Sequence, residues 1–409
     1  MLTHPTERAT PFIYPSDSSG APSAKSPEIR IRGAGVVGST LALGLSAMGI
    51  SVVIEQASDT HAPKDEVRAY ALNQASWLLL EQLKIGSALP PEAVCAVQDM
   101  DVYGDGVGGN LTFSAWQQHT PALARIVDAA ALESALKQAL QFASHVRITS
   151  ASPAAADVAT MSQGADLLVL CEGRDSVTRQ AMGIDWLGHS YDHMAVATRL
   201  ISDVPHGGVA QQWFRSPDIL ALLPMHQPEP DKSYGLVWSV PTHQAHQLMQ
   251  LDDLGFEQAL HQALAQSHHA SAPIAAGQLK LAGARRAWPL QVGRAQRTSG
   301  SGWVMLGDCA HVVHPLAGQG LNLGLADVVE LLRTLAQRES WRSLGDARLL
   351  ARYARARLVS TLAMTSVTDG LWQLFNTHTP WVKTLRNQGM GWMDRADFLK
   401  QKCIAWAMN

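Results

Sequence analysis

The stretch that follows the first 27 residues constrains the fold more than any other part of the chain. A short alternating segment, 28–32, predicts a strand that leads directly into Gly33-Ala34-Gly35-Val36-Val37-Gly38. We expect a helix from Ser39 to Met48, and then a second strand from Ile50 to Ile54 that ends at Glu55. A strand, a GxGxxG turn, a helix, a second strand and an acid about twenty residues on form the dinucleotide-binding fingerprint.

Each glycine in this turn has its own physical task. Gly33 makes the tight turn, Gly35 lets a pyrophosphate approach the helix N-terminus, and Gly38 lets the helix pack on the strand. Glu55 is placed to accept hydrogen bonds from the hydroxyls of an adenosine ribose. We therefore assign Gly33, Gly35, Val37, Gly38 and Glu55 to a dinucleotide cofactor.

A second glycine-rich stretch, GDCAHVVHPLAGQGLNLG, spans Gly307 to Gly324. It follows an apolar run, 303–306, that predicts a buried strand, and it precedes a segment from Leu325 that predicts a helix. Asp308 stands where the strand ends, a position from which a carboxylate can bind a sugar-like hydroxyl. The AGQG turn aims backbone N–H groups at whatever lies above the helix start, which favours negative charge.

This stretch resembles the second flavin-binding motif of the FAD-dependent aromatic hydroxylases, the family of p-hydroxybenzoate hydroxylase. Its similarity is greatest to the ubiquinone-biosynthesis branch, which carries a nearly identical GD-x-A-H-x-x-H-P-x-A-G-Q-G-x-N-L-G segment. The resemblance implies that Asp308 binds the ribityl chain of FAD and that Gly318 to Asn322 lie against the flavin ring. The cofactor-binding residues that it implies here are Gly307, Asp308, Pro315, Gly318, Gly320, Leu321 and Asn322.

Two charged residues elsewhere take part in the resemblance. The family carries an Arg where this chain has Arg68, and there it contacts FAD near the path of the nicotinamide donor. The segment 171–179 resembles the family's Asp-Gly motif, with Glu172 in place of the Asp, so the carboxylate moves out by one methylene. The family also has a polar residue at the start of a helix where this chain has Asp128-Ala129-Ala130-Ala131, so one expected FAD contact is replaced.

Charge and cysteine usage exclude several classes of protein. The net charge of −3 over 409 residues gives no electrostatic case for nucleic acid. Four scattered cysteines without metal spacing, and no signal peptide, predict a reducing cytoplasm, with peripheral attachment at the inner membrane as the alternative. His311 and His314 lie three apart in a turn with Pro315, which favours packing over a metal site, and we predict none.

The fold class that follows is α/β (α+β overall): a Rossmann-like FAD-binding domain, a mostly antiparallel β-sheet substrate domain and a helical C-terminus. Residues 1–27, rich in Pro, Ser, Thr and Ala, predict a disordered leader. We expect the FAD-binding domain to be discontinuous and the sheet to be interrupted by it. The predicted boundaries are 28–97, 117–185 and 283–345 for the FAD-binding domain, 98–116 and 186–282 for the substrate domain, and 346–409 for the C-terminal helices.

The resemblance implies a monooxygenase that hydroxylates a polyprenyl phenol in ubiquinone biosynthesis. NAD(P)H would reduce FAD, dioxygen would give the flavin C4a-hydroperoxide, and its distal oxygen would pass to the ring, so no catalytic side chain is assigned. One alternative is a flavin reductase or a halogenase, although the segment 237–241, VWSVP, only partly matches the halogenase signature W-x-W-x-I-P. Another alternative is a flavin-bound scaffold of a biosynthetic complex. The departures from the family pattern at Glu172 and Ala130 favour this alternative.

The C-terminal segment from Trp381 to Asn409 mixes aromatic with basic residues. This composition favours docking on a membrane surface or a membrane-bound partner, since a polyprenyl substrate resides in lipid. Packing over the substrate domain is the alternative.

Overall fold

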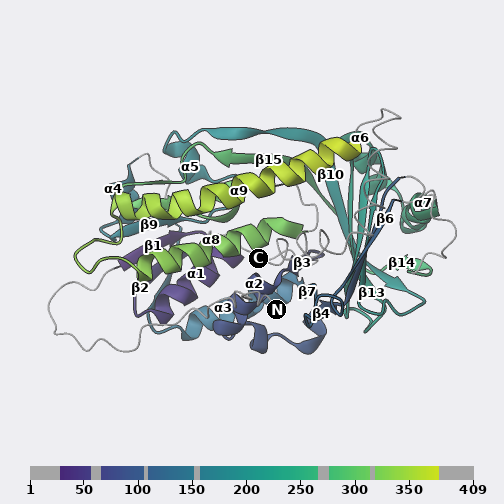
Figure 1. Ribbon diagram of the computed structural model, residues 1–409, viewed down its shortest axis with the longest axis horizontal. Coiled ribbons are helices and arrows are strands. Elements are labelled where there is room, and N and C mark those ends of the chain that lie inside the picture. The colour runs from purple at the N-terminus through teal and green to yellow at the C-terminus, as the bar shows by residue number, and fades with distance from the viewer. Residues whose placement is uncertain are drawn as a thin grey trace, which may run out of the picture.

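The computed structural model describes residues 28–56, 66–105, 109–151, 157–265, 276–313 and 318–376. The predicted leader, Pro315, His314 and the segment from Trp381 to Asn409 lie outside these residues. Figure 1 shows a layered α/β part at one end and a large sheet at the other, with the long helix α9 running across both. The predicted fold class is confirmed.

A six-stranded sheet forms the first part, in the order β16-β17-β9-β1-β2-β8. Its five longest strands are parallel, and only the short β16 runs antiparallel. Parallel strands need helical crossovers, which α1 and α3 supply. The elements are β1 (Glu28–Arg32), α1 (Val36–Ala47), β2 (Ser51–Gln56), α3 (Ala129–Phe142), β8 (Val146–Ser150), α4 (Val158–Ser162), β9 (Leu167–Leu170), α5 (Val177–Ala181), β16 (Ser299–Gly300) and β17 (Trp303–Met305).

A nine-stranded sheet forms the second part, in the order β18-β15-β10-β13-β12-β11-β5-β6, with β14 added on β10. All of its pairs are antiparallel except β11 with β5. Helices α6 (Thr242–Gln250) and α7 (Asp253–Ala265) accompany it. Its strands are β5 (Asp99–Tyr103), β6 (Asn110–Ser114), β10 (Trp186–Ser202), β11 (Val209–Phe214), β12 (Ile219–Met225), β13 (Ser233–Pro241), β14 (Leu279–Leu281), β15 (Arg286–Ala295) and β18 (His311–Val312).

A three-stranded sheet lies between the two large ones. Strand β7 (Ala124–Asp128) pairs on one side with β3 (Ala69–Leu72) and on the other with β4 (Val94–Val97), both antiparallel. Helix α2 (Gln74–Gln82) follows β3 and packs its buried Trp77 and Leu80 into the largest hydrophobic core. The Asn73 side chain caps α2 by accepting the Ser76 N–H at 2.8 Å, which is a common helix start.

Strand pairing divides the chain later than the predicted boundary at residue 283. Strands β15 and β18, which that boundary assigns to the cofactor domain, both belong to the nine-stranded sheet. The reason is the length of β10: its seventeen residues pair with β13 at one end and with β15 along most of their course, from Trp186 opposite Ala295 to Ala197 opposite Arg286. The first part of β10 is difficult to predict from the sequence, because Gly188 and the polar residues beside it interrupt the apolar pattern of a strand.

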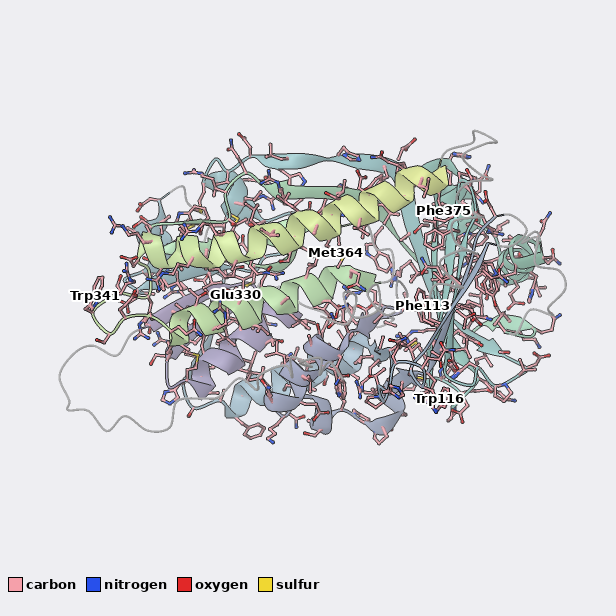
Figure 2. The ribbon with its side chains drawn as sticks, in the orientation of Figure 1. Phe113, Trp116, Glu330, Trp341, Met364 and Phe375 are labelled. Carbon is pink, nitrogen blue, oxygen red and sulfur yellow. The ribbon has the colours of Figure 1, made fainter. Side chains whose placement is uncertain are left out.

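Two helices join the parts. Helix α8 (Gln319–Ala336) is mostly buried, and α9 (Ala347–Asn376) covers it. Phe375 lies at the far end of α9, beside the large sheet (Figure 2). The centroids of the Phe375 and Phe214 rings are 4.4 Å apart, which attaches this end of α9 to the sheet. Close by, the Tyr191 hydroxyl donates to Asp369 of α9 at 2.8 Å. Because α9 contacts both parts, it sets the position of the large sheet over the cofactor motifs.

Candidate functional site

The turn between β1 and α1 leaves open space only at its middle glycine. Gly33 has φ +107°, and a Cβ there would lie 2.3 Å from the Cys171 carbonyl oxygen. A Cβ on Gly38 would lie 2.0 Å from the Gly33 oxygen, whereas a Cβ on Gly35 would meet nothing within 4 Å. No side chain caps the start of α1. The first and last glycines are therefore required by packing, and Gly35 faces the space in which a pyrophosphate would lie.

We expect Gly35→Ala to weaken FAD binding about 10- to 150-fold while leaving the stability of the FAD-free protein unchanged. Gly35 has φ −72°, which alanine adopts without strain, and none of the residues that the structure describes lies within 4 Å of the added methyl group. The methyl would instead meet the ligand, and losing a charged hydrogen bond of about 1.5–3 kcal/mol gives this range. Titration of the apoprotein with FAD measures the affinity. Gly370→Ala, also open, is the control, and equal affinity in both variants would contradict the assignment.

Glu55 lies at the end of β2, as predicted, but its carboxylate is already engaged. It is buried, Arg30 donates to it at 2.7 Å, and the Nε atom of Arg32 lies 3.6 Å from its other oxygen. Arg32 stands opposite Glu55 in the parallel register of β1 and β2, which brings these side chains together. A ribose hydroxyl could use only the acceptor capacity that the two arginines leave, since a carboxylate offers about four lone pairs.

Glu172 holds the next turn together. Its carboxylate accepts hydrogen bonds from the Ser176 hydroxyl, from the Thr178 hydroxyl at 2.7 Å and backbone N–H at 3.2 Å, and from Arg32 at 3.2 Å. These bonds fix the start of α5 and join it to the end of β1. The role in cofactor binding that the resemblance implies for Glu172 would thus be exerted through the shape of this turn and through Arg32.

Asp308 projects from the end of β17, within the 3-10 turn Gly307–Cys309. Its side chain is exposed, and it makes no hydrogen bond or ion pair with the residues that the structure describes. The protein atoms around it nevertheless desolvate it, which raises the pKa of its carboxyl group despite the opposing charges of His311 and Arg174. An unpaired carboxylate at this position is suited to accept hydrogen bonds from a ligand's hydroxyl groups.

The start of α8 has the form expected of a ring cradle. Gly318 has φ +67° and lies against Ala71, and a Cβ on Gly320 would meet nothing within 4 Å. Asn322 has a structural task, because its side chain donates to the Ala71 carbonyl at 2.8 Å and accepts the Asn73 N–H at 3.0 Å. These bonds fix α8 to the loop after β3, so the backbone at Gly320 is the part left for a ligand.

Arg68 is oriented by two carboxylates. Its Nη2 atom lies 2.6 Å from Glu66 and 3.3 Å from Glu133, and its side chain remains 42% exposed. The hydrogen bond that Arg68 donates to Glu66 is the main reason that the pKa of Arg68 is raised, and burial opposes the rise. The guanidinium is held in one place yet still accessible, which is compatible with a contact to a bound cofactor.

Arg199 of β10 is a residue that the sequence analysis missed. It is buried, and it donates to the Arg68 carbonyl at 2.7 Å and to Asp128 at 2.8 Å. Asp128 also caps α3 by accepting the Ala131 N–H at 2.8 Å. The polar residue just before Ala129-Ala130-Ala131 therefore completes the helix start and ties it to the large sheet. The only signal in the sequence was the capping preference of Asp.

A buried ionic network supports the Gly307–Asp308 turn from below. Asp327 of α8 accepts hydrogen bonds from the Gly307 N–H at 2.9 Å, from His311 at 2.7 Å and from Arg357 of α9 at 2.6 Å. Burial lowers the pKa of His311, but the charge and hydrogen bond of Asp327 outweigh it, so the pKa is raised overall. His311 thus belongs to a packed and hydrogen-bonded arrangement, and Asp327 and Arg357 extend it.

We expect His311→Gln to destabilise the protein more at low than at high pH. A raised pKa means that folding favours the protonated imidazole, so its contribution is full below the unfolded value of about 6.5 and is lost as the pH rises through the folded value. The loss should be about 1–3 kcal/mol at pH 5.5, as for a hydrogen bond to a charged group. Urea unfolding at pH 5.5, 7 and 8.5 tests this. His145→Gln, at an exposed position, is the control, and a pH-independent difference would refute the assignment.

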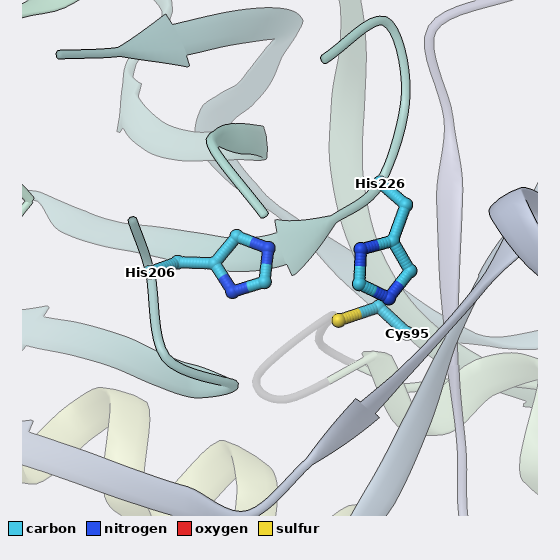
Figure 3. A group of neighbouring side chains, drawn as sticks. All are labelled: Cys95, His206 and His226. Atoms are coloured by element: carbon cyan, nitrogen blue, oxygen red, sulfur yellow. The ribbon is translucent and has the colours of Figure 1, made fainter. Parts of the chain in front are cut away.

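The fold also assembles a trio that sequence spacing does not reveal: Cys95, His206 and His226 (Figure 3). One ligand-type atom of each lies within 4.8 Å of the others. However, both ring nitrogens of His206 are engaged, since one bonds the Met225 carbonyl at 3.0 Å and the other accepts the Gly208 N–H at 3.0 Å. Burial raises the pKa of Cys95 to about 12, which opposes the thiolate that a metal needs. We interpret the trio as hydrogen-bonded core.

An extended dinucleotide with a polyol chain fits the open backbone at Gly35 and Gly320 and the unpaired Asp308. This arrangement is that of a flavoprotein with a cofactor domain and a second, sheet-based domain. The chain belongs to the FAD binding domain family, whose model matches residues 27–368, and FAD is its cofactor. This family assignment covers most of the described structure and both glycine-rich turns.

Known relatives agree with the family resemblance. The chain is 28% identical over 403 residues to 3-demethoxyubiquinol 3-hydroxylase of Escherichia coli, covering 93% of this chain and 98% of the relative. It is 32% identical over 268 residues to the ubiquinone biosynthesis monooxygenase COQ6 of Rattus norvegicus, covering 59% and 56%. The structure of p-nitrophenol 4-monooxygenase from Pseudomonas putida matches with a TM-score of 0.71 at 16% identity, covering 93% and 96%, which shows the fold alone.

Within the described part of the chain, no helix has both the length and the apolar character needed to cross a bilayer.

Proposed function

We propose that this flavoprotein hydroxylates the aromatic ring of a polyprenyl phenol in ubiquinone biosynthesis, with NAD(P)H and dioxygen as co-substrates. The names of the relatives support the substrate class. The observation that carries the proposal is the continuity of the cofactor turn with the large sheet. Directly after Asp308, His311 and Val312 form β18 and pair with Arg294 and Gly293 of β15. An edge of the sheet therefore starts three residues after Asp308, which supports a sheet that covers the bound flavin.

In such a reaction the protein itself would position the cofactor and the substrate and would keep water away from them. When bound, FAD supplies the redox chemistry and the activation of dioxygen. The α8 start presents backbone N–H groups around Gly320, which favour negative charge on a ligand placed there. In this proposal the nine-stranded sheet covers the bound flavin and so keeps water away from it.

Oxygen-18-labelled dioxygen provides the test. The FAD-loaded protein is given NADPH or NADH and a prenylated phenol, and the product is analysed by mass spectrometry. We expect one labelled oxygen atom in the ring. A control without the prenyl tail, 4-hydroxybenzoate, should react more slowly. An unlabelled product, peroxide release unchanged by the phenol, or a halide-dependent product would each reject the proposal.

A further inference from the structure

A cavity lies between the end of β15 and α9, and Asp327 is the residue of α8 that lines it. It has a volume of about 430 Å³ and is enclosed by residues 294–299, which lead from β15 into β16, and by residues 351–362 of α9. A volume of this size holds a small ligand. Nothing in the proposed reaction uses this space.

The walls of the cavity carry positive charge without a matching acid. Arg294, Arg297 and Arg355 line it, and none of the three makes an ion pair or a side-chain hydrogen bond with the residues that the structure describes. Arg357 also lines it and is paired with Asp327. Three unpaired guanidinium groups around one space form the kind of site that binds a phosphate or another multivalent anion.

A buried polar group points to the same conclusion independently. Thr361 lines the cavity with 6% of its surface exposed, and within the described chain its hydroxyl has no hydrogen-bond partner. A buried hydroxyl without a hydrogen-bond partner is costly, so its presence here calls for a ligand or a water molecule that satisfies it. Leu358 and Leu362 add an apolar border and are 45% and 40% exposed. The lining thus suits an anion that carries an apolar group.

The cavity also reaches the network beneath the cofactor turn. His311 and Asp327 lie in its wall, and Asp327 accepts the Gly307 N–H at 2.9 Å. The negative charge of Asp327 is matched by Arg357 and His311, so it does not oppose an anion bound at the other arginines. A ligand here would therefore touch residues that hold the Gly307–Asp308 turn in place.

We propose that this cavity is a binding site for a phosphate-bearing amphipathic anion, distinct from the FAD site. Arg294, Arg297 and Arg355 hold the phosphate, Thr361 donates a hydrogen bond, and Leu358 and Leu362 contact the apolar portion. A lipid headgroup and a soluble phosphorylated metabolite share this chemistry.

The test uses FAD-saturated protein, so that probes do not enter the cofactor site. Inorganic pyrophosphate is titrated calorimetrically at constant ionic strength, and flotation is measured with phosphatidylglycerol and phosphatidylcholine vesicles. The variant is Arg294→Gln with Arg297→Gln. The control is Arg348→Gln, at an exposed position on α9 that does not line the cavity.

We expect the parent protein to bind pyrophosphate or phosphatidylglycerol vesicles. The double variant should weaken this binding at least about tenfold, and the control should leave it unchanged. If the double variant weakens pyrophosphate binding, the ligand is a soluble phosphorylated compound. If it weakens only the binding of phosphatidylglycerol vesicles, the ligand is a lipid headgroup. If neither probe's binding depends on the pair, or if Arg348→Gln weakens it equally, the proposal is overturned.

Thr361→Val separates a site in the cavity from arginines that act only on the surface. The substitution replaces the hydroxyl with a methyl group and keeps nearly the same side-chain shape. The ligand-free protein should therefore be as stable in urea as the parent, or more stable. Binding of the responding probe should fall about tenfold, as for the loss of a hydrogen bond to a charged group. Unchanged binding in this variant would overturn the location of the site.

Discussion

Asp327→Asn should reduce the free energy of unfolding by about 3–5 kcal/mol at neutral pH. The carboxylate is 1% exposed and accepts hydrogen bonds from Gly307, His311 and Arg357. Removing one member of a buried charged group leaves its partners with uncompensated charge, and this is the source of the large penalty. The amide can replace only part of this, because one end of it donates where the carboxylate accepted.

Urea unfolding of the parent and the variant, both without FAD, measures this effect. Glu330→Gln is the matched control, since Glu330 lies on the same helix and pairs with Arg333 at 2.6 Å at a far more exposed position. Exposed pairs of this type contribute up to about 1 kcal/mol. A loss in Asp327→Asn no greater than in the control would mean that the network does not stabilise the turn.

Asp308→Ala should have the opposite profile: a large loss of FAD affinity and no loss of stability. The ribityl hydroxyls would lose a charged acceptor worth about 1.5–3 kcal/mol, which corresponds to a 10- to 150-fold weaker affinity. Desolvation raises the pKa of this acid, so folding disfavours its charged form at neutral pH. Its removal should leave the FAD-free protein as stable as the parent or slightly more so.

Flavin fluorescence titration of the apoprotein gives the affinity, and urea unfolding gives the stability. Asp253→Ala, at an exposed site on α7, controls for the loss of a surface acid. A variant that retains FAD as tightly as the parent would refute the ribityl assignment. A variant that also loses several kcal/mol of stability would show that Asp308 has a structural partner.

The sequence by itself determined the parts of the site whose residues are neighbours in the chain. The turn at Gly33 to Gly38 and the turn at Gly307 to Asp308 each combine a strand end, glycines and a helix start, so local chemistry is enough to predict them. The family assignment of residues 27–368 confirms the class of protein that these turns indicated. The helix start expected at Asp128-Ala129-Ala130-Ala131 is likewise the start of α3 at Ala129.

Only the tertiary structure decided which of these residues are free to meet a ligand. Asn322 and Glu172 resemble cofactor ligands by position, yet their side chains hold neighbouring loops, whereas Asp308 is left unpaired. The arginine-lined cavity combines residues from distant parts of the sequence, from Arg294 to Thr361. Such groupings depend on how strands and helices pack, because the partners of a buried charge are chosen by distance in space and leave no periodic trace in the chain.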